Sequence, residues 1–148
     1  MIIIGADHAG FELKEKIKEI FEEENIEYMD VTTEYIKDDD YTDMTEKVCL
    51  QIREKNMGII ICGTGIGSSM LANKFRGIRA AVCYDRYTAE MTRIDNNANV
   101  LCLGGRTDIG KDMNKIKEIV ITFIKTKFSN EDRHIRRINR ITEIESRR

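Results

Sequence analysis

The chain has 148 residues, of which 41% are hydrophobic and 34% are charged, and its formal net charge at pH 7 is −2. This length favours a single domain over residues 1–148, and the near-neutral charge argues against nucleic acid as a partner. The sequence has neither a long apolar run nor the pattern of a leader peptide, so we expect a cytoplasmic protein without a membrane partner.

Short apolar runs alternate with segments of helical periodicity along the sequence. We expect strands over residues 2–4, 26–31, 58–62, 79–83 and 100–103. We expect helices over residues 10–24, 44–52, 66–75, 85–95, 109–123 and about 130–146, and a polar surface loop over 32–41. Because the strands are continuously apolar, this pattern predicts a three-layer α/β/α, Rossmann-like domain with a five-stranded parallel sheet.

The last expected helix has an apolar stripe but no strand after it. The stripe consists of Ile135, Ile138, Ile141 and Ile144, which recur at helical spacing. An apolar stripe of this kind needs a surface to cover. One solution is that the helix packs on a second copy of the chain.

A glycine-rich loop directly follows the third expected strand, over residues 61–67 (ICGTGIG). Cys62 would end that strand at the carboxyl edge of the sheet, where open α/β sheets bind their ligands. The backbone N–H groups of such a loop can hold an anion, and a following helix N-terminus lowers the pKa of a thiol. Cys62 is therefore a candidate base for taking a proton next to a carbonyl group. The plainer alternative is a buried core cysteine.

The other cysteines point to no metal or redox site. The four cysteines of the chain, Cys49, Cys62, Cys83 and Cys102, lack the spacing of a metal cluster or of a redox pair. In the cytoplasm we expect all of them to be reduced. No metal ion is expected.

Polar residues follow other strands of the expected sheet as well. Asp7 and His8 come after the first strand, so they should also lie at the carboxyl edge, although a helix cap beside a surface histidine would look the same. Arg106 follows the fifth strand.

Near the C-terminus, Arg133 and Arg137 stand four residues apart, on one helix face. Like charges at this spacing are unfavourable unless an anion such as phosphate compensates them, and the fork of arginine fits phosphate. The plainer alternative is a solvated helix face. Similarly, the asparagine-rich segment 95–99 is of a kind that most often supplies turns.

Taken together, these pieces resemble the ribose-5-phosphate isomerase type B family, which includes the galactose-6-phosphate isomerase subunits. The resemblance runs over nearly the whole chain, and the order and spacing of its pieces make it specific. The pieces are Gly5–Gly10, Ile61–Gly67, Ala72–Lys74, Gly77–Ala80, Asn99–Leu101, Gly104–Arg106, and Arg133-His134 with Arg137.

The resemblance implies an aldose–ketose isomerase that acts on a sugar phosphate through a cis-enediolate, without metal or another cofactor. It implies that Cys62 moves a proton between two carbons and that Asp7 and Thr64 handle hydroxyl protons. It also implies that substrate is bound by His8, Tyr41, Gly63, Gly65, Ile66, Gly67, Asn96, Arg106, Arg133 and Arg137. Asn96 and Arg106 match positions that the family contributes across a dimer interface. We therefore expect a homodimer, or a tetramer, with shared active sites.

Three positions bear on the type of enzyme and its substrate. Ser68 stands where relatives without the cysteine carry a glutamate, so this chain is of the cysteine type. Asp95 stands where ribose-5-phosphate isomerases of the family carry a histidine that helps to open the sugar ring, and an aspartate is ionised at neutral pH. Thr42 replaces a proline that usually follows the tyrosine. Asp95 is therefore a candidate specificity position.

Ribose 5-phosphate is the expected substrate, and several alternatives remain open. A tetrose 4-phosphate cannot form a furanose ring and would need no ring-opening histidine. Allose 6-phosphate and galactose 6-phosphate are further sugar phosphates to consider, and a non-catalytic sugar-phosphate-binding subunit is also consistent with the missing histidine. A phosphotransferase-system B domain has a similar cysteine loop, but there the loop follows the first strand, whereas here it follows the third.

Overall fold

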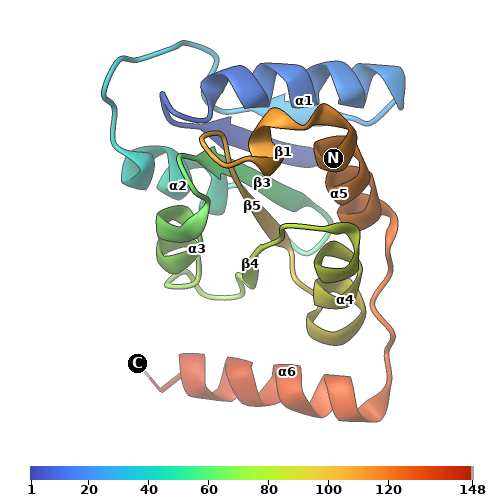
Figure 1. The fold of residues 1–148 in the computed structure, drawn as a ribbon. Coiled ribbons are helices and arrows are strands. Elements are labelled where there is room, and N and C mark those ends of the chain that lie inside the picture. The colour runs from blue at the N-terminus through green and yellow to red at the C-terminus, as the bar shows by residue number, and fades with distance from the viewer. Residues whose placement is uncertain (148) are drawn as a thin grey trace.

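Five parallel strands form the centre of the molecule, in the order β2-β1-β3-β5-β4 (Figure 1). The computed structural model describes residues 1–147. The strands are β1 (Ile2–Ala6), β2 (Tyr28–Asp30), β3 (Met57–Cys62), β4 (Ala80–Val82) and β5 (Val100–Gly104). The five-stranded parallel sheet expected from the sequence is therefore confirmed.

Helices follow the strands along the chain. They are α1 (Phe11–Glu23), α2 (Tyr41–Cys49), α3 (Ile66–Ala72), α4 (Arg86–Asn96), α5 (Met113–Lys125) and α6 (Asp132–Glu145), with a short 3₁₀ helix η1 (Ile109–Lys111) before α5. One expected element differs. The single helix expected over 109–123 is divided at Asp112, whose carboxylate accepts a hydrogen bond from the backbone N–H of Lys115 and so caps α5 instead of lying inside a helix.

Two apolar clusters hold the helices on the two faces of the sheet. One cluster joins α1, α4 and α5 to the sheet through residues such as Ile17, Ala89 and Phe123. The other joins α2 and α3 to the opposite face and includes Val48, Ala72 and Cys62. These two faces give the three-layer α/β/α arrangement, in which Cys62 lies on the α2–α3 side (Figure 1).

The register of the strands brings three strand ends together. Ala6 pairs with Ile61 across β1 and β3, and Cys62 pairs with Gly104 across β3 and β5. The chain changes direction across the sheet between β1 and β3. From β1 it adds β2 on one side, and then β3, β5 and β4 lie on the other side of β1. Open α/β sheets bind their ligands at the carboxyl end of such a switch point.

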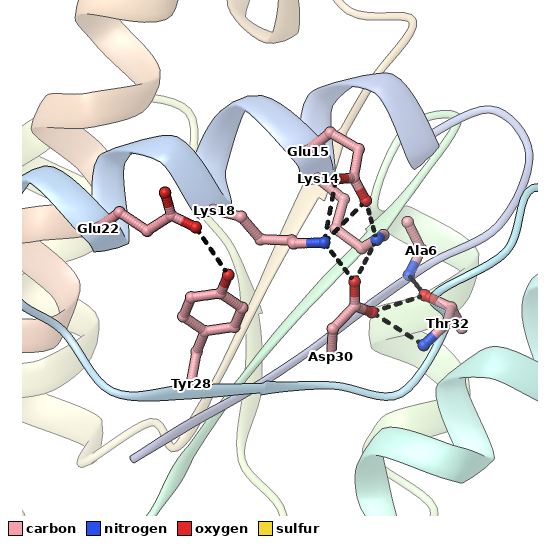
Figure 2. A network of polar contacts seen from close by, with 8 residues as sticks. All are labelled: Ala6, Lys14, Glu15, Lys18, Glu22, Tyr28, Asp30 and Thr32. Atoms are coloured by element: carbon pink, nitrogen blue, oxygen red, sulfur yellow. Dashed lines mark hydrogen bonds and ion pairs between the residues drawn. The ribbon is translucent and has the colours of Figure 1, made fainter.

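A buried ionic network fastens α1 to β2 beside this edge (Figure 2). Lys14 is fully buried, and its Nζ atom lies 2.5 Å from a carboxylate oxygen of Asp30 and 2.5 Å from one of Glu15. Burial alone would raise the pKa of Asp30, but the hydrogen bond from Lys14 lowers it. Asp30 also accepts from the backbone N–H of Thr32, whose hydroxyl oxygen accepts from the N–H of Ala6 at 2.9 Å. The network therefore reaches the end of β1.

The last helix stands apart from the rest of the molecule. Figure 1 shows α6 as a separate rod below α4 and β4. Its contacts are mainly with α4, and near its end Glu145 accepts hydrogen bonds from the N–H of Gly77. A cavity of about 610 Å³ lies between α6 and the body, lined in part by Ile141, Ile144 and Ile78. Among residues 1–147, no helix combines the length and the apolar character that crossing a membrane requires.

Candidate active site

Cys62 ends β3 with its sulfur held against the loop that follows. The side chain is buried, and its Sγ atom accepts a hydrogen bond from the backbone N–H of Gly65 at 3.1 Å. Gly65 has a φ of +82°, in the left-handed region, and a Cβ there would lie 3.1 Å from the backbone of Leu103. Glycine is therefore required for the turn that aims this N–H at the sulfur. The donor stabilises negative charge on the sulfur.

The other three cysteines lie in different surroundings. Burial raises the pKa of Cys49 to about 12 and that of Cys83 to about 12, and it also raises the pKa of Cys102. These three side chains therefore stay protonated thiols near neutral pH. Cys62 ends β3 at the carboxyl edge of the sheet and begins the glycine-rich loop, where a sulfur can meet a substrate.

Asp7 lies next to Cys62 across the β1–β3 pairing. Its backbone N–H donates to the carbonyl oxygen of Ile61, and its Oδ1 atom accepts from the N–H groups of Ala9 and Gly10 at 3.0 and 3.1 Å. Burial raises the pKa of the Asp7 carboxyl, while the hydrogen bond from Gly10 and the nearby His8 limit the rise. A carboxyl group with a raised pKa exchanges protons more readily near neutral pH.

His8 is fixed by groups from two other segments. Its Nδ1 atom lies 2.9 Å from Oδ1 of Asp39, and its Nε2 atom lies 3.4 Å from Nη2 of Arg106. The hydrogen bond with Asp39 raises the pKa of His8. Arg106 donates its backbone N–H to the carbonyl oxygen of Gly63, and its side chain lies near the position that a Cβ of Gly63 would take. His8 and Arg106 therefore stand together above the Cys62 loop.

Other expected binding residues line the same loop. Tyr41 begins α2, and a Cβ at Gly67 would lie 2.8 Å from its ring, so the ring packs on the loop. The hydroxyl of Thr64 is exposed and accepts from the N–H of Ile66 at 3.2 Å. Ser68 is fully buried, and its hydroxyl has no hydrogen-bond partner among residues 1–147.

The structure does not bring four of the expected residues to this cluster. Asn96 lies at the end of α4, and Arg133 and Arg137 lie on α6, away from the loop after β3 (Figure 1). Asp95 also lies on α4, where its Oδ1 atom is 3.4 Å from Nε2 of the buried His134 on α6. That a second copy of the chain brings these residues to Cys62 stays a prediction.

Two further residues, Arg106 and Asp39, contact His8, and the sequence did not mark Asp39. Arg106 lies beside His8 of its own chain, because β5 pairs directly with β3. Its expected contribution across a dimer interface stays a prediction. Asp39 was expected only as part of an acidic surface loop, yet its carboxylate accepts from His8. No sequence signal marked Asp39, since it is one of three consecutive aspartates and stands 31 residues from His8.

The residues that the structure describes contain no group of three His, Cys, Asp or Glu side chains that could hold a metal ion. What the cluster contains is a sulfur with an N–H donor, a buried carboxyl group, and a histidine beside an arginine. These groups suit proton transfer near a bound anion.

Known proteins resemble this chain over nearly its whole length. The family model described as Ribose/Galactose Isomerase matches residues 2–141. Ribose-5-phosphate isomerase B of Escherichia coli K12 is 40% identical over 149 aligned residues, which cover 99% of this chain and 97% of that protein. The structure of ribose-5-phosphate isomerase B from Clostridium thermocellum matches with a TM-score of 0.89 and 39% identity, over 99% of this chain and 97% of that one. The structure of ribose-5-phosphate isomerase B from Mycoplasma genitalium, with bound ribulose-5-phosphate, has a TM-score of 0.90 and 37% identity, over 99% of this chain and 97% of that one.

Proposed function

This chain belongs to the ribose/galactose isomerase family, and on that premise we propose that it interconverts ribose 5-phosphate and ribulose 5-phosphate. The family membership makes it an aldose–ketose isomerase that acts on a sugar phosphate. Two relatives support ribose, since one is named for that substrate and another holds ribulose-5-phosphate. The observation that carries the proposal is the sulfur of Cys62 at the sheet edge, with the N–H of Gly65 donating to it.

In the proposed reaction, the Cys62 thiolate takes the proton from C2 of the open-chain aldose. The electrons of that C–H bond form the C1–C2 double bond, and the aldehyde oxygen becomes an enediolate oxygen. The proton of the resulting thiol exchanges with solvent, and the thiol then delivers a proton to C1 and becomes a thiolate again. The hydroxyl proton leaves the oxygen on C2 and the oxygen on C1 gains one, and Asp7 and Thr64 exchange these two protons.

The loop after Cys62 would stabilise the enediolate. Gly65 already donates to the sulfur, and Ile66 already donates to the hydroxyl of Thr64. We therefore assign the enediolate oxygen to the N–H groups of Gly63, Thr64 and Gly67. In well-studied acyl-transfer enzymes, one such donor contributes about 2.7–4 kcal/mol to the stability of the transition state.

The phosphate group would be bound by residues of two chains. His8 and Arg106 of one chain would meet Asn96, Arg133 and Arg137 of the other in a homodimer. Two features support this assembly: a cavity separates part of α6 from the body of the molecule, and exposed apolar side chains line the neighbouring edge. The exposed apolar side chains of this edge include Val82, Tyr84, Tyr87, Ile141 and Ile144.

Asp95 bears on which sugar is preferred. A carboxylate at this position would suit a tetrose 4-phosphate, which has no ring to open. Against this, Asp95 contacts the imidazole of His134, whose Nδ1 atom lies 2.7 Å from the hydroxyl of Ser129. An imidazole, which can both donate and accept hydrogen bonds, thus contacts Asp95. This pairing favours a cyclic substrate such as ribose 5-phosphate.

A substrate comparison tests the proposed function. We expect purified protein to turn over ribose 5-phosphate with a kcat/KM at least about tenfold above those for erythrose 4-phosphate, allose 6-phosphate and galactose 6-phosphate, a preference of about 1.4 kcal/mol. Asp95→His should raise kcat/KM for ribose 5-phosphate and leave the value for erythrose 4-phosphate unchanged, because only the pentose must open a ring. The measurement is ketose formation with each substrate.

The same comparison separates the alternatives. A preference for erythrose 4-phosphate would replace ribose 5-phosphate by a tetrose phosphate as the substrate. The absence of ketose from every substrate would mean a binding subunit without catalysis. An equal effect of Asp95→His on the pentose and the tetrose would contradict a role of this position in ring opening.

A further inference from the structure

One carboxylate oxygen holds His8 at two points. Oδ1 of Asp39 accepts a hydrogen bond from the backbone N–H of His8 at 2.7 Å and lies 2.9 Å from Nδ1 of its ring. The two side chains are about equally enclosed, with 23% of His8 and 21% of Asp39 exposed. The position of the backbone and the orientation of the ring are therefore set by the same group.

The loop that carries Asp39 is fastened to the end of β1 on both sides. At its start, the hydroxyl oxygen of Thr32 accepts from the N–H of Ala6 (Figure 2). The backbone N–H of Thr32 donates to Asp30, which in turn pairs with the buried Lys14. At its end, Asp39 accepts from the N–H of His8, two residues after Ala6. The aspartate is thus held in place by the fold, although most of its loop is exposed.

The second ring nitrogen of His8 faces an arginine. Nη2 of Arg106 lies 3.4 Å from Nε2, and a guanidinium group can only donate hydrogen bonds. In the neutral form of His8, the proton of Nδ1 points at Asp39 and the lone pair of Nε2 accepts from Arg106. A second proton on Nε2 would direct an N–H at a positive charge. An anion placed between the two groups would remove this conflict.

We propose that Asp39 is a positioning residue that prepares His8 to take up a proton on Nε2 when an anion binds between His8 and Arg106. The proton comes from solvent and forms the N–H bond with the lone pair of Nε2, while Asp39 stays a carboxylate. The inference rests on the proposed function, in which this anion is the phosphate group of the substrate. Substrate binding is then coupled to the protonation of His8.

The charges around His8 give the direction of the effect. Asp39 faces the ring from the loop before α2, Asp7 from the end of β1, and Arg106 from the loop after β5. The hydrogen bond to Asp39 raises the pKa of His8, burial opposes the rise, and the charge of Asp7 adds to it. Anion affinity should therefore fall as pH rises through the pKa of His8. Without the charge of Asp39, this fall should move to lower pH.

Inorganic sulfate is a suitable probe because it stays a dianion over the range in which imidazole titrates, about pH 5 to 8. The ring nitrogen NMR signals of His8, assigned with His8→Gln, report its protonation directly. We expect saturating sulfate to raise the midpoint of the His8 titration in the wild-type protein by about one pH unit or more, which corresponds to about tenfold tighter binding to the protonated form. If sulfate leaves the midpoint of the His8 titration unchanged, the proposal is overturned. This experiment uses only the wild-type protein.

Asp39→Asn tests the role of the carboxylate, and Asp38→Asn is its matched control. Asp38 is an exposed residue of the same loop with a positive φ, which asparagine tolerates, so the control removes the same charge without touching His8. Asp39→Asn should lower the midpoint of the His8 titration. At pH values above this midpoint, sulfate should bind about tenfold more weakly than to the wild type, which corresponds to a shift of one unit in the pKa of His8. Asp38→Asn should match the wild type. Equal behaviour of the two variants would refute the role of Asp39.

Kinetics add a readout that separates this inference from the proposed function. Asp39→Asn should raise KM for ribose 5-phosphate increasingly with pH and change kcat by no more than about twofold, because phosphate contacts are shared by ground and transition states. The sulfate titration requires no turnover, so it stands even if ribose 5-phosphate is not the substrate. Normal turnover with an unmoved His8 midpoint would overturn this inference alone.

Discussion

Replacing Cys62 by alanine is expected to lower kcat for ribose 5-phosphate by about 10²–10⁴-fold, the contribution that a positioned general base makes. The physical reason is that the sulfur is the proposed proton acceptor, and alanine leaves the N–H of Gly65 without a partner and the substrate without a base. The side chain that is lost is small, so the far-ultraviolet circular dichroism should not change. The measurement is the initial rate of ketose formation at saturating substrate.

Cys49→Ala is the matched control for this experiment. Cys49 is as buried as Cys62 and belongs to the same apolar cluster, but it lies at the end of α2 rather than at the strand end that carries the loop. This variant should keep nearly the full kcat. Retention of most activity by Cys62→Ala, with Cys49→Ala equally active, would exclude Cys62 as the base.

Mixing two inactive variants is expected to restore activity. A chain with Cys62→Ala and a chain with Arg137→Glu should exchange subunits after brief denaturation and refolding together. In each mixed dimer, one site combines the intact Cys62 of one chain with the intact Arg137 of the other. Random pairing gives half mixed dimers with one working site each, so about a quarter of the wild-type activity should return in a closed dimer.

The refolded single variants serve as controls, because each should stay inactive when refolded alone. The position of α6 away from the loop after β3 motivates this experiment (Figure 1). A mixture that stays as inactive as its components would contradict shared sites. A monomer with full activity, seen by light scattering, would also contradict them.

Much of the fold follows from local patterns in the sequence. The apolar runs around Ile3, Ile60 and Leu101 predict buried strands, and their alternation with helices predicts the parallel sheet. Parallel strands place their carboxyl ends on one edge, so the nearness of Asp7 and Cys62 could be expected. The strand order could not be predicted from the sequence, because it depends on packing between segments that are far apart in the chain.

The contacts between loops could not be predicted in the same way. Asp39 reaches His8 across 31 residues, and Arg106 reaches it across 98. Neither contact has a local periodicity, and a run of aspartates in a polar loop is indistinguishable from a solvated surface. The division of the expected helix at Asp112 was missed because the apolar spacing of Ile109 and Met113 continues across it. These positions depend on tertiary contacts that the one-dimensional pattern does not contain.

Isomerisation of ribose 5-phosphate in deuterium oxide, followed by proton NMR, tests the account most directly. The proposed route through Cys62 passes the proton to a thiol that exchanges with solvent, so the ribulose 5-phosphate should carry deuterium on C1. The wild-type protein should form this labelled product at a rate typical of enzymes, and Cys62→Ala should not. Ketose that forms without any solvent deuterium, or labelled ketose that forms equally fast without Cys62, would contradict a cysteine-based enediolate mechanism.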